Sequence, residues 1–257
     1  MSLDRDTWID TFYSVSQLER EGLPVDTRWN TVLIADGFEG WWLDPRSKDY
    51  GPNAQYFQHN VVEAKKLLTA AGYANGVQME SITSGTAYGV DFPKWVDVAE
   101  GMAGEAGFRF NKTVVPFAEF GTKYRDVQGR YEGVSYRALP GGGDPLERLV
   151  RDLSAKIGAV TFTGFDGDGK GTYGGAPYLD NLLLKARQES DKEKRKAAVH
   201  DAQRYVGKKQ YVMRFPGGAS SFALRWPVLQ NFNAYLDDQR PFLTYWMDET
   251  QAPLKKS

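Results

Sequence analysis

Alternating strand and helix patterns between residues 77 and 139 most limit how this chain can fold. Val77–Thr83 and Phe108–Val115 are rich in β-branched and aromatic residues, which favours strands. The helical pattern Phe92–Ala106 separates them. A further helix, Ala118–Val127, is predicted before a third strand, Gly133–Leu139. Strands separated by helices of this length favour an α/β fold built from parallel βαβ units with right-handed crossovers.

Helical spacing of apolar residues also marks segments on both sides of this region. Asn60 and Glu63 have the spacing of a capping box before a helix. Ser190 and Glu193 have the same spacing before a helix that runs to about Lys208. The remaining predictions are helices over Leu3–Glu19 and Tyr178–Ala186, a strand over Gln210–Phe215, and no regular element over most of Asp26–Asn60.

The third predicted strand leads into a glycine-rich loop that ends at a helix. Asp144 before Pro145 is typical of an N-cap with proline at the first helical position. Ligands of open α/β sheets collect where strands lead into helices, because backbone N–H groups and a helix N-terminus point there. We therefore expect a ligand site here, with a simple surface turn as the alternative. The candidate contacts are Gly141, Gly142, Gly143 and Asp144.

Aromatic residues and one arginine are further candidates for the wall of a binding cleft. Tryptophan and tyrosine offer flat apolar faces for stacking, and arginine suits a carbohydrate or an anionic group. Most tryptophans instead fill cores or fix loops, so a structural role is the alternative for each tryptophan. The candidates are Trp41, Trp42, Tyr136, Arg137 and Tyr173.

Composition excludes several classes of function. The 32 basic residues nearly balance the 33 acidic ones, so we expect neither nucleic acid nor an anionic membrane as a partner. The chain has no cysteine, and its histidines, His59 and His200, are too far apart in sequence to form a local motif. Phe165–Gly171 resembles the start of a calcium loop, but Lys170 occupies a ligand position and Pro177 replaces the required glutamate. No metal and no cofactor are predicted.

Four stretches, in order along the chain, resemble the family-5 solute-binding proteins of bacterial ABC transporters, which bind dipeptides, oligopeptides or nickel. EAKKLLTAAGYANG, residues 63–76, resembles the family's A-K-K-L-L-x-x-A-G-Y helix before a strand. LDRDTWIDTFY, residues 3–13, resembles the helix that opens the family's second lobe. EGVSYRALPGGGDP resembles a strand, loop and D-P turn. GTYGGAPYLDNLLLKARQESDKEKRKAAVHDAQRYV resembles the family's G-G-Y-x-N-x-x-x-D-x-L-L stretch and the paired helices after it.

The resemblance implies the fold of a C-terminal lobe of the class II periplasmic-binding-protein type, with a mixed, mostly parallel sheet flanked by helices. Residues 1–236 would form one wall of a two-lobe cleft that closes over its ligand. Residues 237–257 would return to the first lobe. A helical pattern that starts almost at the first residue agrees with a fragment cut from a longer protein.

The same resemblance implies the partners and location of the intact protein. We expect a small solute, such as a peptide or an oligosaccharide, and the membrane permease of an ABC importer. The expected location is periplasmic or extracytoplasmic, with or without a lipid anchor, and the expected state is a monomer.

One departure from the peptide-binding members limits the expected ligand. In those proteins a stretch similar to Trp-x-x-Asp precedes the D-P turn, and its acid meets the α-amino group of the ligand. Alignment on Asp144 places Ala138 at the tryptophan and Gly141 at the acid. A buried amine without a counter-ion is strongly disfavoured, so we expect that a free peptide N-terminus is not held at this point.

Two other functions are compatible with the residues. A hydrolase could use Asp144 with Asp166 or Asp168, and an interaction scaffold could use the loop around Trp41 and Trp42. The sequence lacks a cysteine nucleophile, a G-x-S-x-G elbow, a P-loop and an H-E-x-x-H pair, so no catalytic residue is predicted.

Overall fold

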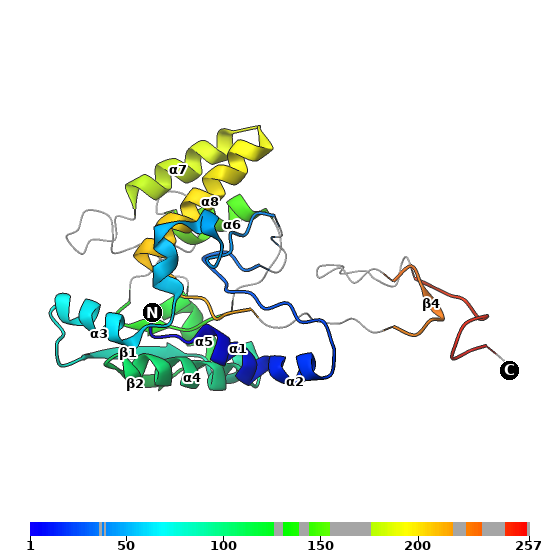
Figure 1. The fold of residues 1–257 in the computed structure, drawn as a ribbon, viewed down its shortest axis with the longest axis horizontal. Coiled ribbons are helices and arrows are strands. Elements are labelled where there is room, and N and C mark those ends of the chain that lie inside the picture. Colours follow the sequence, from blue (N-terminus) through cyan, green and yellow to red (C-terminus); the bar gives the residue numbers. More distant parts are fainter. Residues whose placement is uncertain are drawn as a thin grey trace.

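A computed structural model gives the fold of the chain (Figure 1). It describes residues 1–35, 38, 40–125, 131–138, 144–154, 176–217, 225–232 and 245–255. None of the helices in these ranges combines the length and the apolar character needed to cross a bilayer.

A parallel sheet forms the lower layer of the main body in Figure 1. Strands β1 (Val77–Thr83) and β2 (Phe108–Val114) pair in parallel along their full length, and β3 (Val134–Ser135) pairs in parallel with the other edge of β1. Helix α4 (Phe92–Glu105) is the crossover between β1 and β2. The predicted α/β class and parallel βαβ arrangement are therefore confirmed.

Strand β3 is shorter than the predicted Gly133–Leu139. The Tyr136 N–H still donates to the Ile82 carbonyl at 2.9 Å, but no ladder pairing is present at Arg137 or Ala138. At the start of the strand Gly133 has φ +85°, and an added Cβ there would overlap the Glu80 carbonyl. Only glycine allows this close approach of the two strands.

The predicted first helix is two helices, which corrects the single span Leu3–Glu19. Helix α1 (Arg5–Tyr13) and α2 (Val15–Arg20) meet at Ser14, which has a left-handed φ of 51°. The Asp10 carboxylate accepts a hydrogen bond from the Ser16 N–H at 2.7 Å. This contact satisfies a backbone donor in the first turn of α2 and favours the break.

Helix α3 (Val61–Ala70) confirms half of the predicted capping box. The Asn60 side chain accepts a hydrogen bond from the Glu63 N–H at 2.9 Å. The Asn60 N–H, however, donates to the Met1 carbonyl, and the Glu63 carboxylate pairs with Lys66 at 3.2 Å. The Met1 carbonyl thus accepts the Asn60 N–H, which the Glu63 carboxylate would accept in a complete capping box.

The helix predicted over Ala118–Val127 is a short helix followed by a wider turn. Helix α5 spans Phe117–Phe120, and a π-helical turn continues over Gly121–Arg125. Residues 126 and 127 lie outside the described part of the chain.

Three helices form the upper layer in Figure 1: α6 (Pro145–Leu153), α7 (Pro177–Gln188) and α8 (Lys192–Lys209). Their buried faces share one apolar cluster with residues of the irregular segment, including Leu33 and Phe38. Both predicted helices in this region are confirmed, but the predicted cap Ser190 is wrong. Asp191 directly precedes α8, and its carboxylate accepts from the Lys194 N–H at 2.9 Å.

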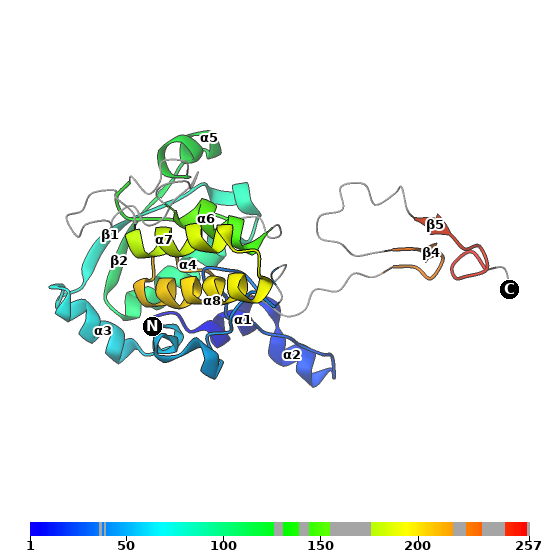
Figure 2. The ribbon, with the colours of Figure 1, turned by 90° about the horizontal axis from the view of Figure 1, so that it is seen from above.

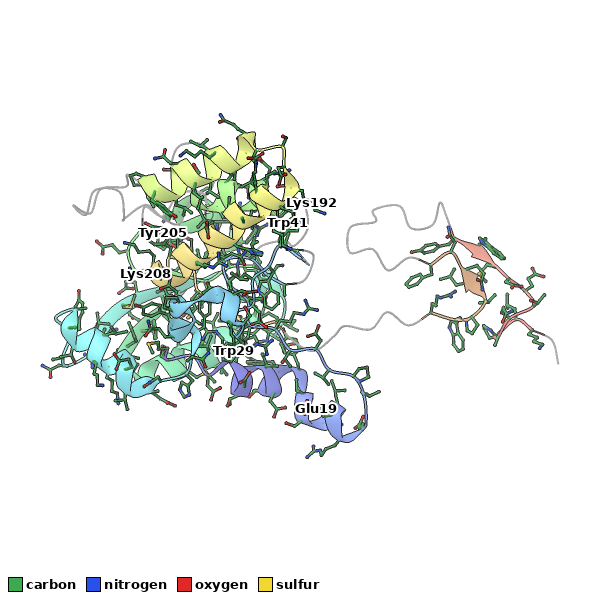
Figure 3. All side chains as sticks on the ribbon, turned by 45° about the horizontal axis from the view of Figure 1, so that its top comes forward. Glu19, Trp29, Trp41, Lys192, Tyr205 and Lys208 are labelled. Carbon is green, nitrogen blue, oxygen red and sulfur yellow. The ribbon has the colours of Figure 1, made fainter. Side chains whose placement is uncertain are left out.

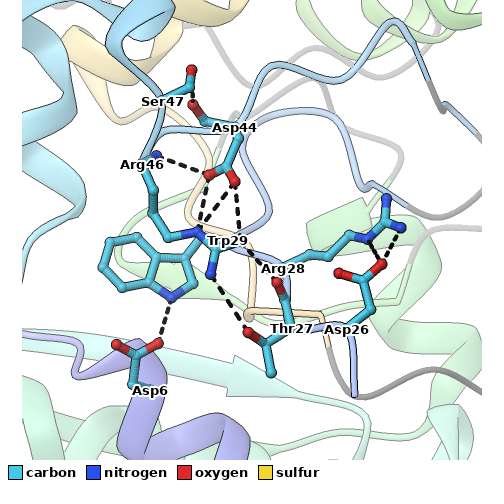
Figure 4. Close-up of polar contacts among 8 residues, drawn as sticks. All are labelled: Asp6, Asp26, Thr27, Arg28, Trp29, Asp44, Arg46 and Ser47. Atoms are coloured by element: carbon cyan, nitrogen blue, oxygen red, sulfur yellow. Dashed lines mark hydrogen bonds and ion pairs between the residues drawn. The ribbon is translucent and has the colours of Figure 1, made fainter. Parts of the chain in front are cut away.

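The long segment Asp26–Asn60 is irregular as predicted, apart from short 3-10 turns over Lys48–Tyr50 and Pro52–Phe57. Polar contacts hold it in place (Figure 4). The Trp29 indole N–H donates to Asp6 of α1 at 2.8 Å. Arg46 pairs with Asp44 at 3.0 Å and also donates to the Thr27 carbonyl at 2.8 Å.

The strand predicted over Gln210–Phe215 is not present. Gln210 ends α8 with a left-handed φ of 55°, and the following backbone bonds to side chains rather than to a ladder. The Phe215 carbonyl accepts from the Asn30 amide at 3.0 Å, and one isolated bridge joins Arg28 to Gly217.

Two short strands near the end of the chain pair with each other. Strands β4 (Leu229–Gln230) and β5 (Trp246–Met247) are antiparallel, and Figures 1 and 2 show them apart from the main body. Trp226, Trp246 and Met247 are exposed. The assignment of residues 237–257 to a segment that returns to another lobe stays a prediction.

Close packing of α8 against the 3-10 turns gives a prediction about Gly207. A Cβ there would overlap the Tyr50 hydroxyl and lie 3.0 Å from Tyr50 Cζ and 3.1 Å from Phe57 Cε2. Tyr50 is fully buried, so we expect Gly207→Ala to lower the free energy of unfolding by about 2 kcal/mol in urea denaturation.

Gly101→Ala in α4 is the matched control. A Cβ at Gly101 meets nothing within 4 Å, so alanine should stabilise the helix by about 0.5–1 kcal/mol. Equal effects of the two substitutions would contradict the packing of α8 on Tyr50.

Candidate functional site

A cavity of about 420 Å³ lies along β3, and its lining runs from Tyr131 before the strand to Ala138 after it. Its walls come from α1, α4, residues 131–138 and the two irregular segments 30–34 and 211–217. Phe92 and Trp95 of α4 follow β1, and residues 136–138 follow β3, so the cavity reaches the edge of the sheet where ligands of parallel α/β folds collect. The sequence predicted a site after this strand.

Stacked aromatic rings line one side of the cavity. The Phe215 ring stacks with Trp8 at 5.3 Å between centroids and with Tyr136 at 6.2 Å, with interplanar angles of 18° and 11°. Trp95 packs edge-on against Trp8 at 5.8 Å. We call Trp8, Trp95, Tyr136 and Phe215 the aromatic wall. Trp95 and Phe215 are its partly exposed members, whereas Trp8 is fully buried behind Phe215 and Tyr136 is 8% exposed.

Tyr136 presents its ring to the cavity and its hydroxyl to α4. Burial, together with the negative charge and hydrogen bond of Glu100, raises the pKa of Tyr136 well above its ordinary value. Glu100 also pairs with Lys112 at 3.0 Å. The Tyr136 phenol therefore stays protonated at neutral pH.

Two arginines, Arg137 and Arg214, line the same cavity. Arg137 Nη1 donates to the Arg125 carbonyl at 3.1 Å, and Arg214 Nε donates to the Val32 carbonyl at 2.7 Å. The Arg214 side chain is only 11% exposed, and Asp152 lies 3.6 Å from its Nη2. Burial lowers the pKa of Arg214 to about 10 against the opposing effect of Asp152, so its guanidinium remains charged at neutral pH.

Asp144 forms the predicted cap of α6 but does not line this cavity. Its carboxylate accepts from the N–H groups of Leu146 and Glu147 at 2.9 and 3.0 Å. Its second oxygen pairs with Arg195 of α8 at 3.0 Å. The Asp144 carboxylate thus holds α6 and α8 together, which is a structural role.

Trp41 and Trp42 also lie outside the cavity lining. Both pack against the apolar cluster of the upper helices, and Figure 3 shows Trp41 beside α8. The Arg195 guanidinium lies 6.0 Å from the centre of the Trp41 ring, and the Trp41 carbonyl accepts from Gln203 at 2.8 Å. Arg28 lies over the Trp42 ring at 5.8 Å.

The structure thus brings together two of the predicted site residues, Tyr136 and Arg137. Four others, Gly141, Gly142, Gly143 and Tyr173, lie outside the described residues, as do Asp166, Asp168 and the calcium-like stretch Phe165–Gly171. Sequence reasoning missed Trp8, Trp95, Phe215 and Arg214. Their local patterns were those of a helix face or a strand, which gave no signal for a shared cavity.

The sequence matches no family model and no curated relative at a significant level. Solved structures, in contrast, match over most of the chain. The periplasmic binding protein DppA from Helicobacter pylori, solved with the peptide STSA, has a TM-score of 0.60 at 16% identity over 96% of this chain. AgaA from Agrobacterium tumefaciens, solved with agropinic acid, has a TM-score of 0.56 at 20% identity over 84%. NikA from Staphylococcus aureus, solved with a nickel–histidine complex, has a TM-score of 0.55 at 15% identity over 84%.

These structures are longer than the present chain, which covers 42%, 38% and 39% of them respectively. At such identities the likeness concerns the fold. The chain therefore has the fold of part of the solute-binding proteins of ABC transporters and spans about two fifths of their length.

Proposed function

We propose that this chain is the C-terminal lobe of the substrate-binding component of an ABC importer. The observation that carries the proposal is the cavity with its aromatic wall at the carboxyl edge of the parallel sheet, in a chain whose fold matches binding proteins over up to 96% of its length. Binding proteins of this type close two lobes over a solute, and here the lobe supplies one wall.

The proposal includes the location and partners of the intact protein. It works in the periplasm or outside the cytoplasmic membrane, as a monomer, and delivers a small solute to a membrane permease. DppA, AgaA and NikA were solved with a peptide, an opine acid and a nickel complex, which makes these three chemistries, together with oligosaccharides, the first solutes to test.

The solute contacts the side of the lobe that carries Tyr136 and Arg137. The glycines Gly141 to Gly143, with Asp144, Trp41, Trp42 and Tyr173, remain proposed contacts that a second lobe would bring into play. Ala138 lines the cavity, and Gly141 offers no carboxylate for a ligand amine. The proposed ligand is therefore not a peptide held by a free N-terminus at this point.

A thermal-shift screen of the protein that carries this lobe tests the proposal. One chemical class among peptides, opines, nickel–histidine complexes and oligosaccharides should raise the melting temperature, because a ligand at 100 times its Kd stabilises by about 2.7 kcal/mol. Turnover of a stabilising solute would identify a hydrolase instead. A protein stabilised by no member of the four classes would contradict solute transport.

The 257-residue chain alone should bind weakly, since one wall provides only part of the contact area. Titration calorimetry of this chain with the solute found in the screen should give at most millimolar affinity. Micromolar or tighter binding would show that the lobe is a complete site.

A further inference from the structure

The charged groups that line the cavity all have the same sign. Among the described residues that form its walls, Arg137 and Arg214 are charged, and no aspartate or glutamate takes part. Apolar and aromatic side chains make up most of the remaining surface. A solute that enters therefore meets cationic and apolar groups together.

The walls contain hydroxyl groups that can donate and accept, such as those of Ser135 and Tyr131, which bond to each other at 2.8 Å. The Trp8 indole N–H is buried and has no hydrogen-bond partner among the described residues. The Asn30 amide is already used, because its Nδ2 donates to the Phe215 carbonyl and its Oδ1 accepts from the Ala35 N–H. Trp8 is fully buried, so its N–H lies behind the cavity surface and reports on what binds there without contacting it.

Among the described residues around the cavity, guanidinium groups outnumber carboxylates. Asp152 is the described carboxylate that contacts Arg214, and it also lies 2.8 Å from Arg148 and 3.2 Å from Arg151. On the opposite side, Glu100 is held by Lys112 and Tyr136. One carboxylate shared by three arginines leaves a positive potential at the cavity, and low-dielectric walls strengthen it.

We propose that the cavity recognises a small organic carboxylate with an apolar or aromatic body. The carboxylate binds at Arg137 and Arg214, and the body lies on the aromatic wall. Arginine suits this role because its planar guanidinium can donate two parallel hydrogen bonds to a carboxylate. The inference rests on the proposed function and defines the class of solute at that same site.

Three probes of similar size but different charge test the proposal on the 257-residue chain: phenylacetate, phenylacetamide and phenethylammonium. Titration is followed by ¹H–¹⁵N NMR, with the assigned indole N–H signal of Trp8 as the reporter. Phenylacetate should shift this signal at millimolar concentration. Phenylacetamide should bind roughly tenfold more weakly, since a charge-assisted hydrogen bond is lost, and phenethylammonium should cause no shift.

Variants of the cationic residues separate the role of Arg137 from a general effect of charge. Arg137→Gln should weaken phenylacetate binding roughly tenfold and leave phenylacetamide binding unchanged, while Arg137→Lys should restore part of the loss. Arg151→Gln is the matched control, because Arg151 contacts the same Asp152 but is 43% exposed and does not line the cavity. An unchanged indole spectrum without ligand verifies that each variant is folded.

Equal affinity for the three probes would overturn the anion preference while leaving the cavity as a solute site, so the proposed function would stand. An equal loss of phenylacetate affinity in Arg151→Gln and Arg137→Gln would also overturn the proposed anion preference. If none of the probes moves the Trp8 signal, the cavity does not receive carboxylates, and the thermal-shift screen then decides the proposed function separately.

Discussion

Asp152→Ala should lower the free energy of unfolding by about 3–5 kcal/mol, one of the two largest effects expected of a single substitution in this chain. The Asp152 carboxylate is 1% exposed and lies between Arg148 at 2.8 Å and Arg214 at 3.6 Å. Its removal leaves these buried cations without their shared negative charge. Urea denaturation followed by tryptophan fluorescence measures the loss.

Asp201→Ala is the matched control for this substitution. Asp201 also pairs with an arginine one helical turn away, Arg204 at 2.7 Å, but its side chain is 53% exposed. Solvent screening limits such a pair to about 0.5 kcal/mol. Similar losses for the two variants would show that Asp152 is not the principal counter-ion of Arg148 and Arg214.

Gln203→Leu should lower the free energy of unfolding by a comparable amount, about 3–4 kcal/mol, because one buried amide makes three hydrogen bonds from α8 to the irregular segment. Gln203 is fully buried. Its Oε1 accepts from the Thr31 hydroxyl at 2.8 Å and from the Leu43 N–H at 3.0 Å, and its Nε2 donates to the Trp41 carbonyl at 2.8 Å. Leucine has a similar size but leaves these buried groups unsatisfied.

Thermal denaturation of Gln203→Leu beside Gln17→Leu checks this expectation. Gln17 also makes a side-chain hydrogen bond, to Glu21 at 3.0 Å, but on an exposed face of α2. Its replacement should change stability by less than about 0.5 kcal/mol. A small loss in both variants would mean that other contacts hold residues 31–43 in place.

Local patterns in the sequence predicted the regular elements well. Strand β1 has the predicted limits Val77–Thr83, and the caps at Asn60 and Asp144 are present because each depends on atoms within three residues. The break at Ser14 was missed because a helical apolar pattern does not record a carboxylate such as Asp10 bonding ahead to the next turn.

Contacts between distant parts of the chain explain what the sequence did not predict about the candidate site. Gln210–Phe215 was predicted to be a strand, yet this segment is irregular and places Phe215 between Trp8 and Tyr136. Trp41 and Trp42 pack against the apolar cluster of the upper helices, and their contact with a ligand stays a prediction. Periodicity identifies which residues share a face, and it gives no information about which distant segment covers that face.

Hydrogen–deuterium exchange of the protein that carries this lobe, with and without the solute that stabilises it most, tests most directly whether the cavity is the solute-binding face. Slower exchange is expected in peptides that cover residues 131–138 and 211–217, which line the cavity. Unchanged exchange in both segments, with protection confined to the outer faces of α3 or α7, would contradict the account.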